Sequence, residues 1–139
     1  MDELPDWEPG TAAVLSVSGP HAIPISTAVR LSGDRLAFAL GRGRHTLARL
    51  RREPAAAVCL FAPGQAFTAY GDATVVREEL EASAGAAALE LRVDRIQDHL
   101  EGARTEILAP VGWRWTADEA AEIDAKIRAE LAGLRDPRA

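Results

Sequence analysis

Short apolar segments separated by tight turns are the feature that most constrains how this chain can fold. Five segments have the pattern of strands, at residues 11–17, 21–31, 35–40, 55–61 and 67–77. Turn-forming residues stand between most of them, as in Ser18-Gly19-Pro20, Ser32-Gly33-Asp34 and Pro63-Gly64-Gln65. Because tight turns join strands in antiparallel order, the sequence predicts a mainly β fold, an antiparallel barrel, in preference to a doubly wound sheet.

The second segment, His21–Leu31, alternates between two faces with a period of two residues. Its large apolar residues share one face with His21, whereas Pro24, Ser26 and Ala28 lie on the other. Pro24 has no N–H group to donate to a neighbouring strand, so this strand is expected at a sheet edge or at a bulge. The backbone near Pro24 is therefore a candidate ligand-binding edge.

Residues 40–54 carry an apolar strand through two glycines into a short arginine-rich helix. Thr46 is the expected N-terminal cap, and Pro54 marks the end of the helix. Leu47 and Leu50 are one turn apart, so both can face the core.

The start of this short helix is a candidate anion site. Backbone N–H groups freed by Gly41 and Gly43, the positive end of the helix dipole, and the side chains of Arg44 and His45 would converge on one point. A phosphate group fits that description. The alternative is that the basic residues form a solvated helix face with no ligand.

Basic residues are concentrated in this segment although the chain as a whole is acidic, with 21 Asp and Glu against 16 Lys and Arg. The segment contains Arg42, Arg44, Arg49, Arg51 and Arg52, with Glu53 as its only acid. Arg44 and Arg49 are the expected anion ligands. Arg51 and Arg52 stand late in the helix, where a positive charge is favoured by the helix dipole without any ligand.

The C-terminal third mixes helical and extended patterns. Residues 78–88 are rich in Ala and Glu and predict a helix, whereas residues 89–100 fit a strand and a helix equally well. Residues 105–115 have an extended pattern in which Trp113 and Trp115 point the same way. A capping box at 116–119 and an apolar stripe then predict a final helix at about 117–134.

Length, composition and residue spacing exclude several classes of protein. A chain of 139 residues predicts a single domain, 1–139, and no segment reaches the roughly 18 apolar residues of a membrane span. The acidic start does not have the pattern of a signal peptide, and the single Cys59 excludes an internal disulfide, so we expect a cytoplasmic protein. A net charge of −5 argues against nucleic-acid binding. The three histidines stand far apart, so no metal site is expected.

The order of these segments resembles that of the pyridoxamine 5′-phosphate oxidase-like superfamily of flavin-binding split β-barrels. The resemblance rests on Ala13–Val17, Pro20–Ile25, Arg35–Phe38, Leu47–Pro54, Ala56–Leu60, Gly71–Val76 and Trp113–Thr116. It implies a split antiparallel barrel with a short connecting helix and a C-terminal helix. It also implies that Leu89–Gln97 is a barrel strand and that two chains pair as a homodimer, with a cofactor in the cleft between them.

Members of this family bind FMN, or the deazaflavin coenzyme F-420, and use it for hydride transfer. The resemblance implies that residues 21–26 run beneath the flavin ring and that Arg44, Thr46 and Arg49 hold the phosphate. The expected cofactor-binding residues are His21, Pro24, Ile25, Ser26, Arg44, His45, Thr46, Arg49 and Trp113. Many relatives have an asparagine before the leucine of the helix, whereas this chain has Ala48-Arg49-Leu50.

No side chain has the context of a catalytic acid, base or nucleophile. This agrees with flavin chemistry, in which the cofactor performs the difficult step and the protein positions it. It equally agrees with the absence of catalysis. The function that the resemblance implies is a flavin- or deazaflavin-dependent oxidoreductase acting on a small molecule. The alternative is a non-catalytic or cofactor-free split-barrel dimer.

Overall fold

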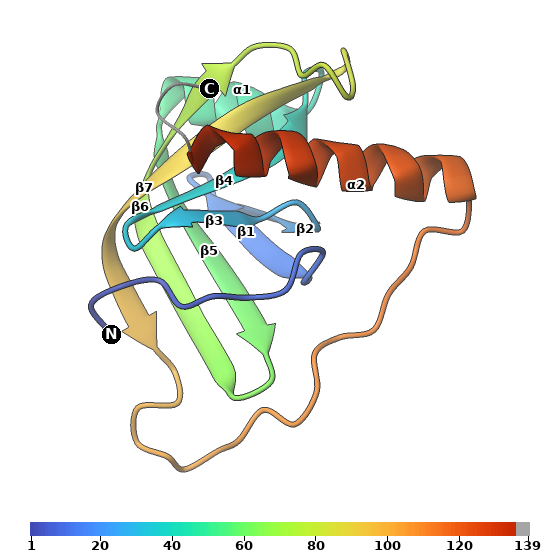
Figure 1. The fold of residues 1–139 in the computed structure, drawn as a ribbon. Helices are drawn as coiled ribbons and strands as arrows, with labels where there is room; N and C mark the ends of the chain where they lie inside the picture. Colours follow the sequence, from blue (N-terminus) through green and yellow to red (C-terminus); the bar gives the residue numbers. More distant parts are fainter. Residues whose placement is uncertain (136–139) are drawn as a thin grey trace.

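A computed structural model describes residues 1–135 of the chain, in which seven strands form one antiparallel sheet accompanied by two α-helices (Figure 1). The elements are β1 (Ala13–Val17), β2 (His21–Ile25), β3 (Val29–Ser32), β4 (Arg35–Gly41), α1 (His45–Arg52), β5 (Ala55–Ala62), β6 (Gln65–Arg77), β7 (Ala86–Asp98), α2 (Asp118–Ala132) and a terminal 3-10 turn, η1 (Gly133–Arg135). The strand order is β2-β1-β5-β6-β7-β4-β3.

The two edges of the sheet, β2 and β3, are separated in the chain only by Ser26, Thr27 and Ala28. Four peptide steps span at most about 14 Å, so the two edges must approach each other and the sheet must curl. The result is a barrel that is open between β2 and β3, a gap that we call the split. The expected mainly β, split antiparallel barrel is confirmed.

The continuous strand expected at His21–Leu31 is wrong, because the chain leaves the sheet between Ile25 and Val29. The Ser26 hydroxyl donates a hydrogen bond to Asp124 Oδ1 at 3.0 Å, and Thr27 Oγ1 accepts one from the Ala39 N–H at 3.0 Å. These side-chain bonds hold the backbone in a connection instead of a ladder. The apolar alternation simply continues across the break.

The barrel interior is filled by large side chains that alternate with small ones along the strands. In β4, Leu36, Phe38 and Leu40 point inward, whereas Ala37 and Ala39 face the opposite side. The same interior contains Leu15, Val58, Leu60, Phe67, Leu89 and Leu91. Leu47 and Leu50 of α1 also join it, and α1 ends at Arg52, as the sequence predicts.

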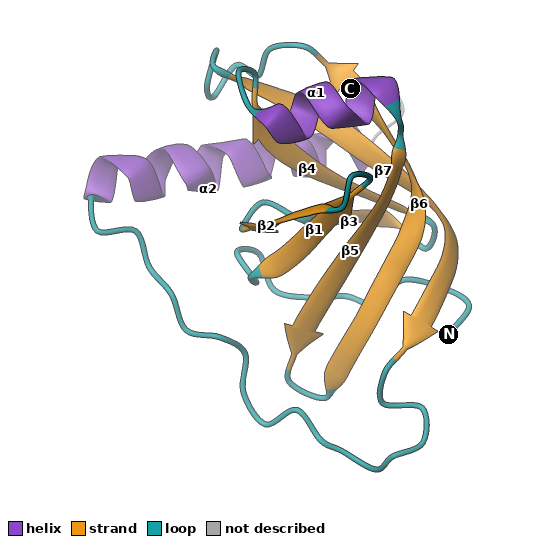
Figure 2. Ribbon diagram, turned by 180° about the vertical axis from the view of Figure 1, so that it is seen from behind, coloured by secondary structure: helices purple, strands orange, loops and turns teal. Residues whose placement is uncertain are grey.

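Helix α2 packs on the outside of the barrel, against β3 and β4 (Figure 2). Leu131 is completely buried in a second, smaller apolar cluster with Val29, Leu31 and Ala37. The small side chains on the outer face of β4 leave room for a helix to lie close to the sheet. The predicted final helix is therefore confirmed.

The capping box expected at 116–119 does not form. The N-cap residue is Ala117, with no side-chain hydrogen bond to the first turn, so Thr116 lies one position too early to cap the helix. Asp118 and Glu119 instead place two negative charges in the first turn, where they offset the positive end of the helix dipole.

The helix expected at residues 78–88 is also wrong. Residues 78–85 form an irregular connection, and β7 begins at Ala86. The Glu130 carboxylate of α2 accepts hydrogen bonds from the backbone N–H groups of Glu81 and Ala82, at 3.1 and 2.8 Å, and Leu80 is buried in the smaller cluster. These contacts, made by a residue far away in the sequence, outweigh the helix propensity of the alanines.

The ambiguity at residues 89–100 is resolved in favour of a strand, as the family resemblance implies, because β7 pairs with both β4 and β6. Residues 99–117 contain no helix or strand and run along the outside of the barrel to the start of α2 (Figures 1 and 2). The extended pattern expected at 105–115 therefore forms no sheet strand. No helix in residues 1–135 is long and apolar enough to cross a membrane.

Candidate functional site

The edge position expected for the strand that contains Pro24 is confirmed. Within residues 1–135, strand β2 pairs only with β1, where Pro24 lies opposite Val14, and its other edge faces the split. His21 and Ile23 are half-buried and Ile25 is buried, whereas Pro24 is exposed. This alternation leaves one face of β2 in the interior and keeps Pro24 accessible to a ligand.

A cavity of about 210 Å³ lies beside the end of β2. It is lined by residues 23–27, by residues 39–41 with Arg44, and by Trp115 and Asp124 from the C-terminal part of the chain. The structure thus brings together four of the expected site residues, Pro24, Ile25, Ser26 and Arg44. They meet because β4 runs to the start of α1 at the same end of the barrel at which β2 ends.

Arg44 occupies the N-cap position of α1, and its own N–H bonds to the Gly41 carbonyl at 3.1 Å. The first turn of α1 contains no acidic residue and has no side-chain cap. Its leading N–H groups therefore have no side-chain partner in the cap, and the anion site expected here stays a prediction. The Arg44 side chain is exposed and forms no ion pair with any residue between Met1 and Arg135.

Thr46 does not cap the helix, which corrects the prediction. It lies inside the first turn, is buried, and its hydroxyl lies 2.9 Å from His21 Nε2. A buried hydroxyl needs a partner, and the His21 ring supplies it. The pair ties β2 to α1, so two expected cofactor-binding residues are in contact with each other. His45 follows Arg44 with an exposed side chain.

Arg49 lies at the turn between β1 and β2. Its Nη1 donates to the Ser18 carbonyl at 3.1 Å, and the guanidinium lies against Gly19. Gly19 has a φ of +135°, and a Cβ at that position would overlap Arg49. The remaining guanidinium donors stay available.

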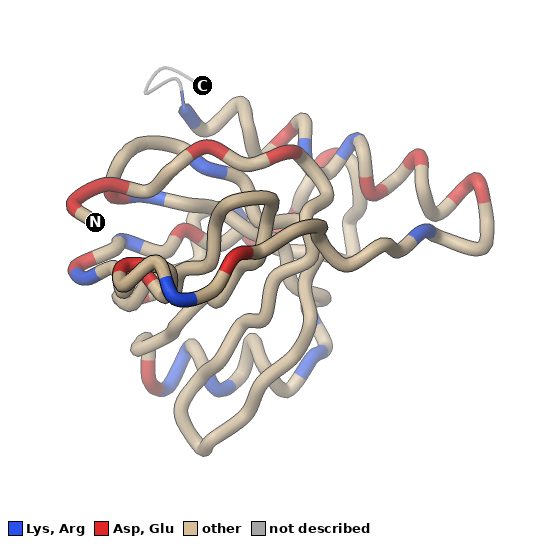
Figure 3. The backbone as a smooth tube through the Cα atoms, turned by 90° about the horizontal axis from the view of Figure 1, so that it is seen from below, with Lys and Arg blue, Asp and Glu red and all other residues tan. Residues whose placement is uncertain are grey.

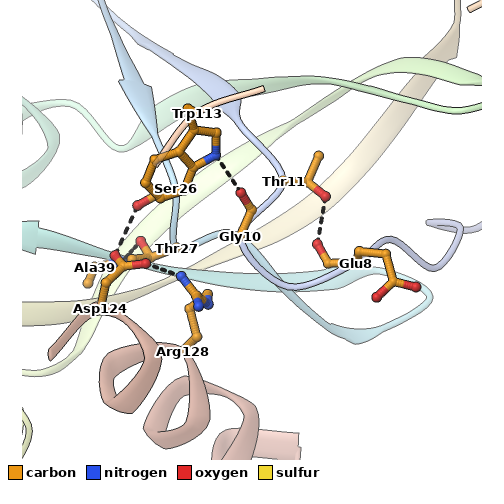
Figure 4. Close-up of polar contacts among 9 residues, drawn as sticks. All are labelled: Glu8, Gly10, Thr11, Ser26, Thr27, Ala39, Trp113, Asp124 and Arg128. Atoms are coloured by element: carbon orange, nitrogen blue, oxygen red, sulfur yellow. Dashed lines mark hydrogen bonds and ion pairs between the residues drawn. The ribbon is translucent and has the colours of Figure 1, made fainter. Parts of the chain in front are cut away.

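Trp113 does not line the cavity. Its indole N–H donates to the Gly10 carbonyl at 2.8 Å (Figure 4). Its ring meets that of Trp115 edge-on, with the centroids 5.9 Å apart. Trp115 is the tryptophan that reaches the cavity. The two rings are 40% and 45% exposed respectively, so both present apolar surface to their surroundings.

The sequence reasoning missed the end of β4 and the C-terminal part of the cavity lining, where Trp115 and Asp124 are the polar or aromatic contributors. Asp124 is 4% exposed, accepts from the Ser26 hydroxyl, and forms an ion pair with Arg128 one turn further along α2 (Figure 4). A signal for it exists in the sequence. Asp124 stands four residues after Ala120 and three before Ile127, which places a carboxylate on the apolar stripe of the helix.

Charged residues of both signs are spread along the chain (Figure 3). Unlike Arg44, Arg51 forms an ion pair on the surface, with Glu78. The Arg51 guanidinium donates two hydrogen bonds to Glu78, and these lower the pKa of the Glu78 carboxyl. The pair lines a larger cavity of about 440 Å³ that includes Leu50 and Val75. That cavity contains none of the expected cofactor-binding residues, and Arg51 needs no ligand, as the sequence predicts.

The remaining histidine, His99, is remote in sequence from the other two. Its Nε2 atom lies 2.7 Å from the Thr68 hydroxyl oxygen. Among residues 1–135 there is no group of three or more His, Cys, Asp or Glu side chains that could hold a metal ion.

Solved structures with the same architecture were found by comparison of folds. A putative pyridoxamine 5′-phosphate oxidase from Listeria innocua aligns with a TM-score of 0.52 and 21% identity over 64% of this chain and 88% of its own. An F420 reductase aligns with a TM-score of 0.54 and 12% identity, over 63% and 90% of the two chains. HupZ from Group A Streptococcus aligns with a TM-score of 0.55 and 12% identity, over 73% and 90%.

At the level of sequence, neither a protein-family model nor a curated protein matches this chain. The structural likeness confirms the fold that the segment order indicates, the pyridoxamine 5′-phosphate oxidase-like split barrel. Because the sequence identities are 21% or less, this structural likeness supports the fold alone.

Proposed function

We propose that this split-barrel protein is an FMN- or deazaflavin-dependent oxidoreductase that transfers a hydride to or from a small molecule. The observation that carries the proposal is the cavity in which the edge strand β2 meets Arg44 at the uncapped start of α1. A flavin cofactor has a planar ring and a phosphate, and this site offers a strand edge for the first and a cation with free backbone N–H groups for the second.

Some of the residues present fit such a cofactor, whereas others are already hydrogen-bonded within the chain. Arg44 is free to bind phosphate, and Pro24 and Ile25 offer a narrow apolar wall to a ring. The hydroxyls of Ser26 and Thr27 are both used within the chain, so a donor to the ring would be a backbone N–H group. When bound, the cofactor would supply the hydride chemistry, while the protein orients it and limits the access of water.

The size of the cavity indicates that one chain does not complete the site. Its 210 Å³ lies below the roughly 300–1,000 Å³ of typical ligand pockets. We therefore propose a homodimer in which a second copy covers the open side. Exposed apolar residues near the C-terminal connection support this, since Leu108 is 80% exposed and Val111 is 68% exposed.

The names of the neighbouring structures support both cofactor options. One is described as a putative pyridoxamine 5′-phosphate oxidase and another as an F420 reductase. The first name supports FMN only through the family resemblance stated above, and the second supports the deazaflavin coenzyme. FMN is the first choice here and coenzyme F-420 the alternative.

A second candidate function is a non-catalytic split-barrel dimer that binds a cofactor without using it, or binds none. The engaged hydroxyls of Ser26 and Thr27 and the small cavity favour it, because they reduce the polar groups available to tune a ring.

Purified protein distinguishes the two candidates. Its absorption spectrum is recorded as isolated and after incubation with FMN or coenzyme F-420 followed by removal of free ligand. The oxidoreductase proposal expects retained cofactor that is reduced by a nicotinamide or exchanges hydride with a quinone or nitro-aromatic acceptor. Retention without any reduction favours the non-catalytic candidate, and the absence of retention of either cofactor overturns the proposal.

A further inference from the structure

Asp124 is the only charged residue in the described part of the chain that is buried. Removing a carboxylate from water is costly unless the carboxylate is paired and hydrogen-bonded. Asp124 meets that requirement with two partners, the Ser26 hydroxyl on Oδ1 and the Arg128 guanidinium on Oδ2 (Figure 4). A carboxylate has about four acceptor positions, so two contacts leave acceptor capacity unused.

The simplest role for Asp124 would be to attach α2 to the barrel. Other contacts already do this. Leu131 is buried in the apolar cluster, and Glu130 bonds to Arg77 and to two backbone N–H groups of the connection before β7. An apolar residue at position 124 would pack against the sheet without the desolvation cost of a charge. The position of the carboxylate, in the wall of the candidate cavity, gives it a second role.

The cavity holds two opposite charges that do not neutralise each other. Arg44 forms no ion pair within residues 1–135, and Asp124 is paired with Arg128, not with Arg44. Because the Ser26 hydroxyl donates to Asp124, its oxygen can still act as an acceptor. The cavity is thus lined both by a donor to an anion, Arg44, and by acceptors for an N–H group, Asp124 and Ser26.

We propose that Asp124 is a specificity-determining residue of this cavity, which accepts a hydrogen bond from an N–H group of the bound ligand. The proposal rests on the proposed function and deepens it, because flavins and deazaflavins both carry one imide N–H, at ring position N3. A ligand without that donor would place an apolar group against the buried carboxylate. A site built to accept a hydrogen bond binds such a ligand much more weakly.

The test compares riboflavin with N3-methylriboflavin, which lacks the donor, by fluorescence titration. Neither ligand has a phosphate, so Arg44 does not enter the comparison. The wild-type protein is expected to bind riboflavin at least tenfold more tightly than the methylated ligand. In Asp124→Asn, which keeps the size of the side chain, Arg128 would keep the single amide oxygen as its acceptor, and the amide NH2 group would replace the other acceptor oxygen. Riboflavin affinity should therefore fall about tenfold while the affinity for the methylated ligand stays, so that the ratio approaches one.

Asp118→Asn is the matched control, because it removes an exposed carboxylate from the same helix and should leave the ratio unchanged. An equal loss of both ligands in Asp124→Asn overturns the proposal, since a residue that only attaches α2 would act on both alike. A wild-type protein that does not discriminate overturns it without any variant. Wild-type protein that binds neither of these two ligands, nor FMN, nor coenzyme F-420 overturns the proposed function and this proposal with it.

Discussion

Arg44 and Arg49 were expected to act alike, and the structure gives them different surroundings. Arg44 is exposed at the start of α1 and forms no ion pair within residues 1–135, whereas Arg49 donates to the Ser18 carbonyl. We expect Arg44→Ala to weaken FMN binding by about 1.5–3 kcal/mol, the range for a hydrogen bond to a charged group. Isothermal titration with FMN measures the loss.

Riboflavin is the control ligand for this prediction, because it has no phosphate and should bind Arg44→Ala as well as wild type. Arg51→Ala is the matched variant, since that arginine is occupied by Glu78 and should not affect FMN. An equal loss of FMN and riboflavin in Arg44→Ala would make this residue structural and remove the phosphate from the start of α1.

Gly19 and Arg49 form a second residue-scale pair. Gly19→Ala places a side chain at a φ of +135° and into the Arg49 guanidinium. A strained backbone of this kind costs about 1–3 kcal/mol, so urea unfolding should show that loss of stability. In an Arg49→Ala background the steric part disappears and the loss should be smaller. Gly85→Ala is the control, because no atom lies within 4 Å of its added Cβ.

At the scale of elements, Glu130 links α2 to the connection between β6 and β7. Burial raises the pKa of its carboxyl, but hydrogen bonds from the Ala82 and Glu81 N–H groups and from Arg77 outweigh this and lower the pKa below its ordinary value of 4.5. A lowered folded-state pKa stabilises the fold above the unfolded value, and this stabilisation is lost as the pH falls through the folded value.

We therefore expect the unfolding free energy to fall as the pH decreases below about 4.5, and Glu130→Gln to flatten part of that decline. Chemical unfolding followed by circular dichroism between pH 7 and pH 3 measures it. Glu122→Gln, on an exposed position of the same helix, is the control. A decline of the same slope in wild type and Glu130→Gln would contradict the assignment.

Elements whose spacing of apolar residues coincides with their buried face could be predicted from the sequence. Segments held by residues far away in the chain could not. Leu47 and Leu50 mark the inner face of α1 directly in the sequence, and the stripe that ends at Leu131 does the same for α2. The sequence of residues 78–85 contains no such pattern, because the hydrogen bonds that hold this segment are made with Glu130, which is far away in the chain. The sequence analysis missed the break after Ile25 for a similar reason, since the Ser26 hydroxyl donates to the distant Asp124.

For the molecule as a whole, we expect a homodimer. Leu108, Val111, Trp113 and Trp115 expose apolar surface along one connection, and the candidate cavity is open and small. Burial of such surface stabilises association. Sedimentation velocity at micromolar concentration should give the mass of two chains, and Leu108→Asp combined with Val111→Asp should shift it to one.

A wild-type monomer under these conditions would contradict the dimer, and the tryptophans would then cover only their own chain. Val76→Asp is the matched control, since it places a charge on an exposed apolar residue of β6 and should leave the mass unchanged. If all three proteins were dimers, the interface would lie elsewhere.

The candidate site could be predicted only in part, because it is assembled from three distant stretches. Pro24 and Arg44 each have a local signature, a proline in a strand and a cation at a helix start. Asp124 lies 98 residues from its partner Ser26, and no local pattern joins them. Sequence reasoning therefore found two walls of the cavity and missed the third.

The course of residues 99–117 has a consequence for how the molecule could be divided. This connection is the covalent link between the barrel and α2, while Leu131, Glu130 and Asp124 hold α2 to the barrel by contacts of their own. We thus expect a protein cleaved within the exposed stretch 101–106 to remain assembled as a two-piece complex, with the barrel and the helix as separate polypeptides that recognise each other.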